Sequence, residues 1–248
     1  PSNAIIFDTK TKEWKEVGKG ITVAVGATGS FVDGFYWHNG EAITPIDERY
    51  ASAFIRDWCT KDGEDDPYYD EALSANLSEE LATSKGTVYN ENGSMTFYKN
   101  FFFAPDSNRT ITTVGAPSSK AGNPGRPTVV PWEINEALAE MVVHGAASGT
   151  KYNFLEAGQG ATEVDVVSPP CVADIKEKLQ ELMEAKHVPV YIKGLVDEDY
   201  CVKRYKASID FIEKYGHAYI GNGALMLTKI DTNTNSIMAE SFSKFPYQ

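Results

Sequence analysis

The chain has 248 residues, of which 42% are hydrophobic, and a formal net charge of −12 at pH 7. This hydrophobic fraction is enough for a sizeable core and excludes a disordered chain. Nucleic acid is not expected as a partner, because a protein that binds DNA or RNA must neutralise phosphates, and the sequence has no dense cluster of Lys and Arg.

The cysteines and the apolar segments bear on the compartment. Cys59, Cys171 and Cys201 are too few and too scattered for a disulfide framework, which favours a reducing compartment or indifference to redox conditions. The first residues show no signal peptide, and no apolar run is long enough to span a bilayer. We therefore expect a soluble protein, made in the cytoplasm or carried in a virion, without membrane insertion.

The chain begins with short strands separated by turns. A polar turn at 8–12 separates segments 4–7 and 14–17, which predicts a hairpin. Segment 21–25 predicts a short buried strand. The glycine-rich step 26–29 that follows is similar to the first turn of a nucleotide-binding unit. That chemistry needs a helix start and a further glycine where this chain has Val32, so we interpret 26–29 as a turn between strands and expect no cofactor.

Two strong local signals come next. The Asn39-Gly40 step tolerates positive φ, and it predicts a type I′ turn within an antiparallel hairpin over 31–43. Thr44 then precedes Pro45 and an acidic residue, which is the composition of a helix start. A helix is therefore predicted from 45 to about 59.

One more helix is predicted near 71–84, after an acidic loop at 62–71. Residues 115–127 are rich in proline and glycine and are the best candidate for a long loop or linker. Both loops are predicted to be contact surfaces, because they are long and polar. Further strands are predicted at 87–90, 94–103 and 110–114.

Beyond residue 128, helices with 3.6-residue spacing alternate with short apolar segments. Helices are predicted at 131–144, 169–186 and 197–215. Strands are predicted at 152–155, 163–167, 188–194, 218–220, 224–230 and 237–242. The order from 163 to 230 reads β-α-β-α-β, which would place two helices on one face of a small sheet.

Together these elements predict an α+β protein. Its N-terminal half is β-rich with hairpins, and its C-terminal half has a small β-α-β-α-β sheet and helices. The predicted division is a β-rich region with an inserted helix at 1–114, a loop or linker at 115–128 and an α/β region at 129–248. One intertwined domain is the alternative.

Candidate metal ligands lie in the acidic loop. An EF-hand counted from Asp62 needs a turn glycine where the chain has Pro67, so that motif is excluded. A looser site of oxygen ligands remains a hypothesis, and a solvated acidic loop is its alternative. Its candidate ligands are Asp62, Glu64, Asp66 and Asp70.

The histidines and Cys171 are predicted to have structural roles. No histidine neighbours a second His or a Cys at ligand spacing, so zinc is not expected. His144, His187 and His217 fall near predicted helix C-termini, where an imidazolium interacts favourably with carbonyl groups. Cys171 lies in the first turn of a predicted amphipathic helix, and we expect it to be packed rather than reactive.

No catalytic motif is present, so no catalytic residue is assigned. The predicted function is a structural or attachment component of a larger assembly, such as the capsid, tail or baseplate of a virus or phage particle, which associates with itself or with other subunits. One alternative is a hydrolase that acts on a carbohydrate or other polar substrate through a carboxylate pair. Another is a glycan- or peptide-binding module. The carboxylates that favour the hydrolase, Glu41, Asp47 and Glu48, lie near an aromatic hairpin in the sequence.

Overall fold

The chain forms two compact units, and each contains helices and strands. The first unit consists of Pro1–Val32 and Thr44–Ser119, and the second of Asp33–Ile43 and Lys120–Gln248. The predicted α+β class is therefore confirmed. The computed structural model describes residues 2–30, 34–110, 130–154, 160–231 and 234–246. The predicted linker at 115–128 lies outside them and, with the boundaries drawn from it, stays a prediction. So does the strand at 110–114, apart from Thr110.

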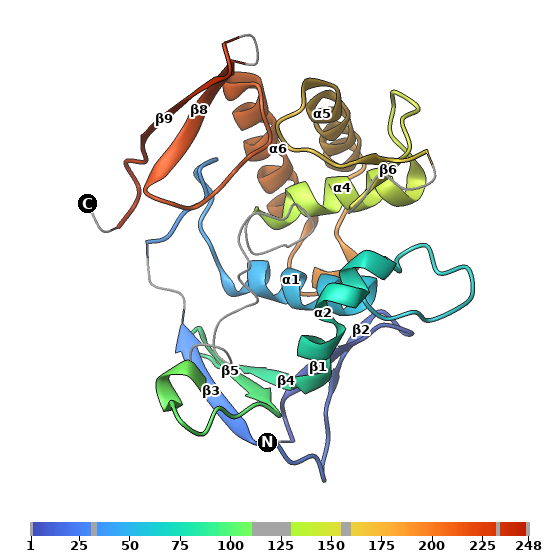
Figure 1. Ribbon diagram of the computed structural model, residues 1–248, viewed down its shortest axis with the longest axis vertical. Helices are drawn as coiled ribbons and strands as arrows, with labels where there is room; N and C mark the ends of the chain where they lie inside the picture. Colours follow the sequence, from blue (N-terminus) through green and yellow to red (C-terminus); the bar gives the residue numbers. More distant parts are fainter. Residues whose placement is uncertain (1, 31–33, 111–129, 155–159, 232–233, 247–248) are drawn as a thin grey trace. The chain divides into compact units, whose positions relative to one another are not determined.

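The first unit is built on an antiparallel sheet of five strands in the order β2-β1-β4-β5-β3 (Figure 1). The opening hairpin is confirmed, and the strands predicted at 87–90 and 94–103 do pair with each other, but the second one ends at Lys99. The strands are β1 (Ile5–Asp8), β2 (Glu13–Glu16), β3 (Val25–Ser30), β4 (Ser84–Tyr89) and β5 (Ser94–Lys99).

The glycine-rich segment is part of β3, so the predictions of a strand at 21–25 and a turn at 26–29 are wrong. Ile21 is 54% exposed, and the strand begins only at Val25. Gly26 pairs with Tyr98 of β5, and a Cβ atom on Gly26 would lie 2.9 Å from the tyrosine ring. The glycine is therefore explained by close approach of an aromatic ring in a strand.

Strands β3 and β5 alternate between a more buried and a more exposed face, as expected when one face of a sheet is buried. Ala27, Met95 and Phe97 are buried on the apolar face. On the other face Thr28 and Thr96 share a hydrogen bond between their hydroxyl groups, 2.9 Å long. The helices α1 (Pro45–Trp58) and α2 (Glu71–Thr83) lie along one side of the sheet (Figure 1).

Helix α1 has the predicted start and the predicted apolar stripe. Thr44 and Asp47 form a reciprocal capping box, with Pro45 in the first turn. The ring of Phe54 stacks on Tyr50 and on Trp58, with centroids 5.8 and 5.3 Å apart. All three rings are essentially inaccessible, so this helix supplies much of the core of the first unit.

The second unit is organised around three helices, α4 (Trp132–His144), α5 (Pro169–Glu184) and α6 (Glu198–Tyr215). The bounds of all three helices agree with the predicted bounds to within two residues. Asp197 caps the start of α6, and Gly216 ends the helix in the left-handed conformation. Every residue of α4 from Trp132 to Ala139 is buried, so α4 is the central helix. Two short strands, β6 (Tyr152–Asn153) and β7 (Thr162–Glu163), pair in parallel.

The predicted β-α-β-α-β sheet is wrong. Segment 188–194 contains a 3-10 turn, η1 (Val190–Ile192), in which the amide of Ile192 donates to the carbonyl of Pro189. A short apolar run cannot distinguish a buried strand from a buried helical turn. Residues 218–220 also form no strand, and their one bond toward the expected sheet runs from the Ala218 amide to the Val166 carbonyl.

The hairpin predicted at 31–43 is confirmed in its described part, but its turn type is not I′. Tyr36 bridges to Ala42, and the amide of Gly40 donates to the carbonyl of Trp37. Asn39 therefore lies inside the turn, and Gly40 follows it with a φ of 91°. This is the pattern of a type I turn followed by a left-handed glycine. Residues 31–33 lie outside the described range.

The C-terminal hairpin consists of β8 (Leu225–Asp231) and β9 (Ser236–Ser241), close to the strands predicted at 224–230 and 237–242. The strands are antiparallel, with a bulge between Leu227 and Lys229. Figure 1 shows them as a ribbon of two strands, and no other described strand pairs with either edge.

Candidate metal centre and candidate assembly surface

The acidic loop does not gather its carboxylates around one point. Although 62–70 is described throughout, no three of the four candidates have oxygen atoms within 4.8 Å of one another. The carboxylate of Asp66 accepts hydrogen bonds from the backbone amides of Asp62 and Tyr68. The carboxylate of Asp70 caps the start of α2 by accepting a hydrogen bond from the amide of Leu73. These carboxylates have local structural roles, and the metal prediction for this loop gains no support from its geometry.

The carboxylates that favoured a hydrolase have separate partners. Glu41 pairs with Lys203, with 2.8 Å between the carboxylate oxygen and Nζ. Asp47 closes the capping box of α1. Glu48 is buried and accepts a hydrogen bond from the hydroxyl of Tyr89. Burial raises the pKa of Glu48 to about 7, although the Tyr89 hydrogen bond acts in the opposite direction.

Cys171 has the predicted structural environment. Its side chain is buried, and its Sγ accepts the backbone amide of Asp165 at 3.3 Å. Burial raises the pKa of the Cys171 thiol, which lowers the fraction of reactive thiolate at neutral pH.

The three histidines lie at or just beyond helix ends, as predicted, but their imidazoles contact other groups. His144 is the last residue of α4, and its Nε2 lies 3.7 Å from Glu140. The Nε2 of His217 hydrogen-bonds to the carbonyl of Leu227 at 3.1 Å, which connects the end of α6 to β8. His187 lies three residues beyond the end of α5, and its imidazole reaches the carboxylate of Glu136 on α4.

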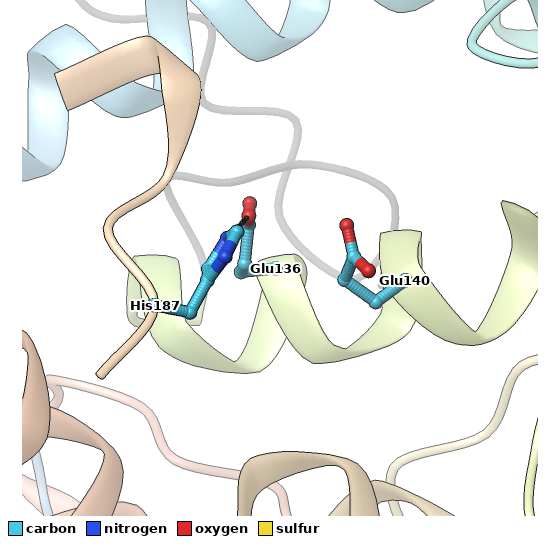
Figure 2. Close-up of side chains that lie close together, drawn as sticks. All are labelled: Glu136, Glu140 and His187. Atoms are coloured by element: carbon cyan, nitrogen blue, oxygen red, sulfur yellow. Dashed lines mark hydrogen bonds and ion pairs between the residues drawn. The ribbon is translucent and has the colours of Figure 1, made fainter. Parts of the chain in front are cut away.

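Glu136, Glu140 and His187 form the cluster with the strongest potential for chemistry. In the described part of the chain it is the one set of three such groups whose ligand atoms all lie within 4.8 Å of one another. The two carboxylates are one turn apart on α4, and Figure 2 shows them on the same side of the helix. The Nε2 atom of His187 lies 2.7 Å from an oxygen of Glu136.

The backbone of His187 is held in place by two independent contacts. Lys186 has a φ of 50°, and the amide of His187 donates to the carbonyl of Leu182, which forms a Schellman motif at the end of α5. The hydroxyl of Tyr205 on α6 donates to the carbonyl of His187 at 3.2 Å. The imidazole therefore approaches α4 from a fixed position.

The electrostatics of the cluster are dominated by negative charge. Burial raises the pKa of Glu140, and the neighbouring charge of Glu136 raises it further. Burial alone would lower the pKa of His187, but its hydrogen bond to Glu136 and the charges of both carboxylates raise it above the ordinary value. The cluster therefore favours the binding of a proton or another cation.

One turn earlier on α4, Glu133 is completely paired. Its Oε2 accepts hydrogen bonds from Nε and Nη2 of Arg204, at 3.1 and 2.8 Å. Its Oε1 accepts the hydroxyl of Ser208 at 3.0 Å and the amide nitrogen of Asn39 at 3.1 Å. Four donors thus satisfy a carboxylate with no exposed surface, and they attach the Asp33–Ile43 hairpin to α4 and α6.

Sequence reasoning missed this cluster because His187 is 51 residues from its carboxylate partner. Zinc was not expected because no histidine has a second His or a Cys at ligand spacing. The local signal that could have been used is the pair Glu136 and Glu140, which share one helix face at i and i+4.

The C-terminal hairpin presents an uncovered row of aliphatic side chains, which we call the apolar face. The pairs Leu225–Ser241, Leu227–Ala239 and Ile230–Ile237 place their side chains on this face. On the opposite face Met226 is buried, whereas Lys229, Met238 and Glu240 are exposed. The apolar face consists of Leu225, Leu227, Ile230, Ile237 and Ala239.

The exposure of this face is large for aliphatic residues. Leu225 is 67% exposed and Ile237 is 71% exposed, and every residue of β9 is exposed. A hairpin of two strands is marginally stable unless something packs on it. The base of the hairpin is anchored by buried Met226 and Phe242, and on the apolar face Leu227 and Ile230 are partly buried whereas Leu225, Ile237 and Ala239 are exposed.

No protein-family model matches the chain, and no curated protein matches it either.

Among the described helices, none has both the length and the apolar character needed to cross a bilayer.

Proposed function

We propose that the protein is a component of a larger assembly and that its subunits join through the apolar face of the β8–β9 hairpin. The observation that supports this is a row of aliphatic side chains on a ribbon of two strands, in which Leu225, Ile237 and Ala239 are exposed. Contiguous exposed apolar surface is typical of interaction sites, whereas isolated exposed apolar residues are common and need no explanation.

A second copy of the chain is the partner that fits this face best. The face carries no charged residue, although the whole chain has a net charge of −12. Two like-charged subunits can therefore meet here without bringing carboxylates together. A contact between two identical faces closes around a two-fold axis, and the two hairpins would pack face to face like the sheets of a sandwich.

The kind of particle expected from the sequence, a virus or phage capsid, tail or baseplate, remains a prediction within this proposal. The hydrolase and the glycan- or peptide-binding module also stay as alternatives. Both are expected to act as monomers, so the oligomeric state distinguishes them from an assembly component.

Two neighbouring residues of β9 provide a matched test. Ile237→Asp places a carboxylate on the apolar face, and Met238→Asp places the same group on the opposite face, at a residue that is 56% exposed. We expect Ile237→Asp to weaken self-association at least about tenfold, because the carboxylate would have to be desolvated at the contact, which corresponds to about 1.4 kcal/mol. Met238→Asp should leave the molar mass measured by sedimentation velocity unchanged. Equal effects of the two substitutions, or none, would contradict the proposal.

A further inference from the structure

We propose that Glu136, Glu140 and His187 form a binding site for one divalent transition-metal ion, such as Zn²⁺ or Mn²⁺. The geometry of the three side chains carries this inference. Their ligand atoms all lie within 4.8 Å of one another, and they come from two elements that the fold brings together (Figure 2). The site is independent of the β8–β9 hairpin and of the assembly proposal.

The distances require only small side-chain adjustments. Two ligands that each lie about 2.1 Å from one ion are roughly 3.0 Å apart at octahedral angles and roughly 3.4 Å apart at tetrahedral angles. The 2.7 Å between Nε2 of His187 and the Glu136 oxygen is closer to the octahedral value. The side chain of Glu140 is 21% exposed, so it has room to turn its carboxylate toward the same point.

The donor set selects the class of ion. An imidazole nitrogen is a preferred ligand of Zn²⁺ and other first-row transition metals, whereas Ca²⁺ and Mg²⁺ prefer oxygen ligands alone. Three protein ligands leave a coordination position for water. The side chain of His187 is 32% exposed, which gives the ion a route from solvent.

The charges of the cluster provide an independent reason for a cation. Glu133 receives four hydrogen bonds from three side chains, including a guanidinium group. Glu136 and Glu140 place two carboxylates beside the imidazole of His187, and Glu140 also has the imidazole of His144 3.7 Å away and Lys178 nearby. A divalent ion held between the two carboxylates and His187 would link α4 to the segment between α5 and α6, so it would stabilise the second unit.

The primary test compares two substitutions that remove one carboxylate each. Glu140→Gln changes a proposed ligand, and Glu177→Gln changes an exposed residue of the neighbouring helix α5. After treatment with a chelator, the wild-type chain and Glu177→Gln should bind one Zn²⁺ per chain in calorimetry, and Zn²⁺ should raise the Tm of both. Glu140→Gln should bind Zn²⁺ at least about tenfold more weakly. Equal Zn²⁺ affinity in all three proteins, or no binding, would overturn the proposal.

A second measurement uses the wild-type chain and does not depend on the folding of a variant. Binding of Zn²⁺ through Nε2 should shift the ¹⁵N resonances of His187 at one equivalent of the ion and leave those of His217 unchanged. Ca²⁺ at the same concentration should produce no such shift. A shift at His217 instead, or an unaffected His187, would contradict the assigned ligands.

Discussion

The two antiparallel sheets of this protein differ in what lies on their apolar faces. In the first unit the apolar face of the five-stranded sheet is buried, and α1 contacts it through Glu48 and Arg49, which meet Tyr89 on β4. In the second unit the apolar face of β8–β9 has Leu225 and Ile237 more than half exposed. The apolar face of the sheet is thus buried within the chain in the first unit, whereas in the second unit part of the apolar face remains exposed. This difference is the basis of the proposed contact with a second subunit.

The covered sheet should lose the most stability when its cover is damaged. Phe54 is fully buried between Tyr50 and Trp58 on α1. We expect Phe54→Ala to lower the free energy of unfolding of the first unit by about 3–5 kcal/mol, because a large buried ring is lost and a cavity remains. Urea unfolding followed by tryptophan fluorescence measures this. A loss below about 1 kcal/mol would show that α1 is not the main cover of the sheet.

A second expectation concerns pH at the same contact. Burial raises the pKa of Glu48 from 4.5 to about 7, so the folded chain binds more protons than the unfolded chain between these values. The stability from this group is fully present below pH 4.5 and is lost as pH rises through 7. At about 1.4 kcal/mol per pKa unit, the loss is about 3 kcal/mol.

Glu48→Gln mimics the protonated acid and should remove this pH dependence. The variant should match the wild type near pH 4.5 and be more stable by up to about 3 kcal/mol above pH 7. Urea unfolding of both proteins across this pH range measures the difference. Asp8→Asn is a suitable comparison, because the hydrogen bond from Lys15 lowers the pKa of Asp8, so Asp8 does not cause a fall in stability as pH rises and this variant, which keeps Glu48, should retain the fall seen in the wild type. Parallel pH profiles of the wild type and Glu48→Gln would rule out the buried acid as the cause.

The smallest effect on a single chain is expected at the uncovered sheet. Ile237→Ala removes an aliphatic side chain that is 71% exposed, so the free energy of unfolding of the monomer should change by less than about 0.5 kcal/mol. Chemical unfolding at the lowest usable protein concentration gives this value. A loss of 2 kcal/mol or more would mean that Ile237 is already packed within its own chain, and the contrast between the two sheets would disappear.

Local signals predicted the helices well because the information lies within a few residues. Thr44 and Pro45 gave the start of α1, and Asp197 and Gly216 gave both ends of α6. Strands were less predictable, because a strand is defined by a partner elsewhere in the chain. Segment 188–194 has a strand-like composition but no neighbouring strand, and it contains a 3-10 turn instead. Gly26 reads as a turn residue until its pairing with Tyr98 is known.

The candidate sites were predicted only in part, for the same reason. Strands β8 and β9 were predicted from the sequence, but the exposure of Leu225 and Ile237 depends on what the rest of the chain covers. Glu136 and His187 meet only because α4 and the end of α5 pack together. No local pattern encodes that contact, and a search for paired histidines or cysteines could not find it.

The most direct test of the account is the molar mass of the wild-type chain as a function of concentration, measured by light scattering after size-exclusion chromatography. If the apolar face of β8–β9 joins subunits, the mass should rise from that of a 27.3 kDa monomer toward that of a dimer as concentration increases. A constant monomer mass from about 1 µM to 1 mM, the range of Kd over which weak specific complexes form, would contradict self-association through this face.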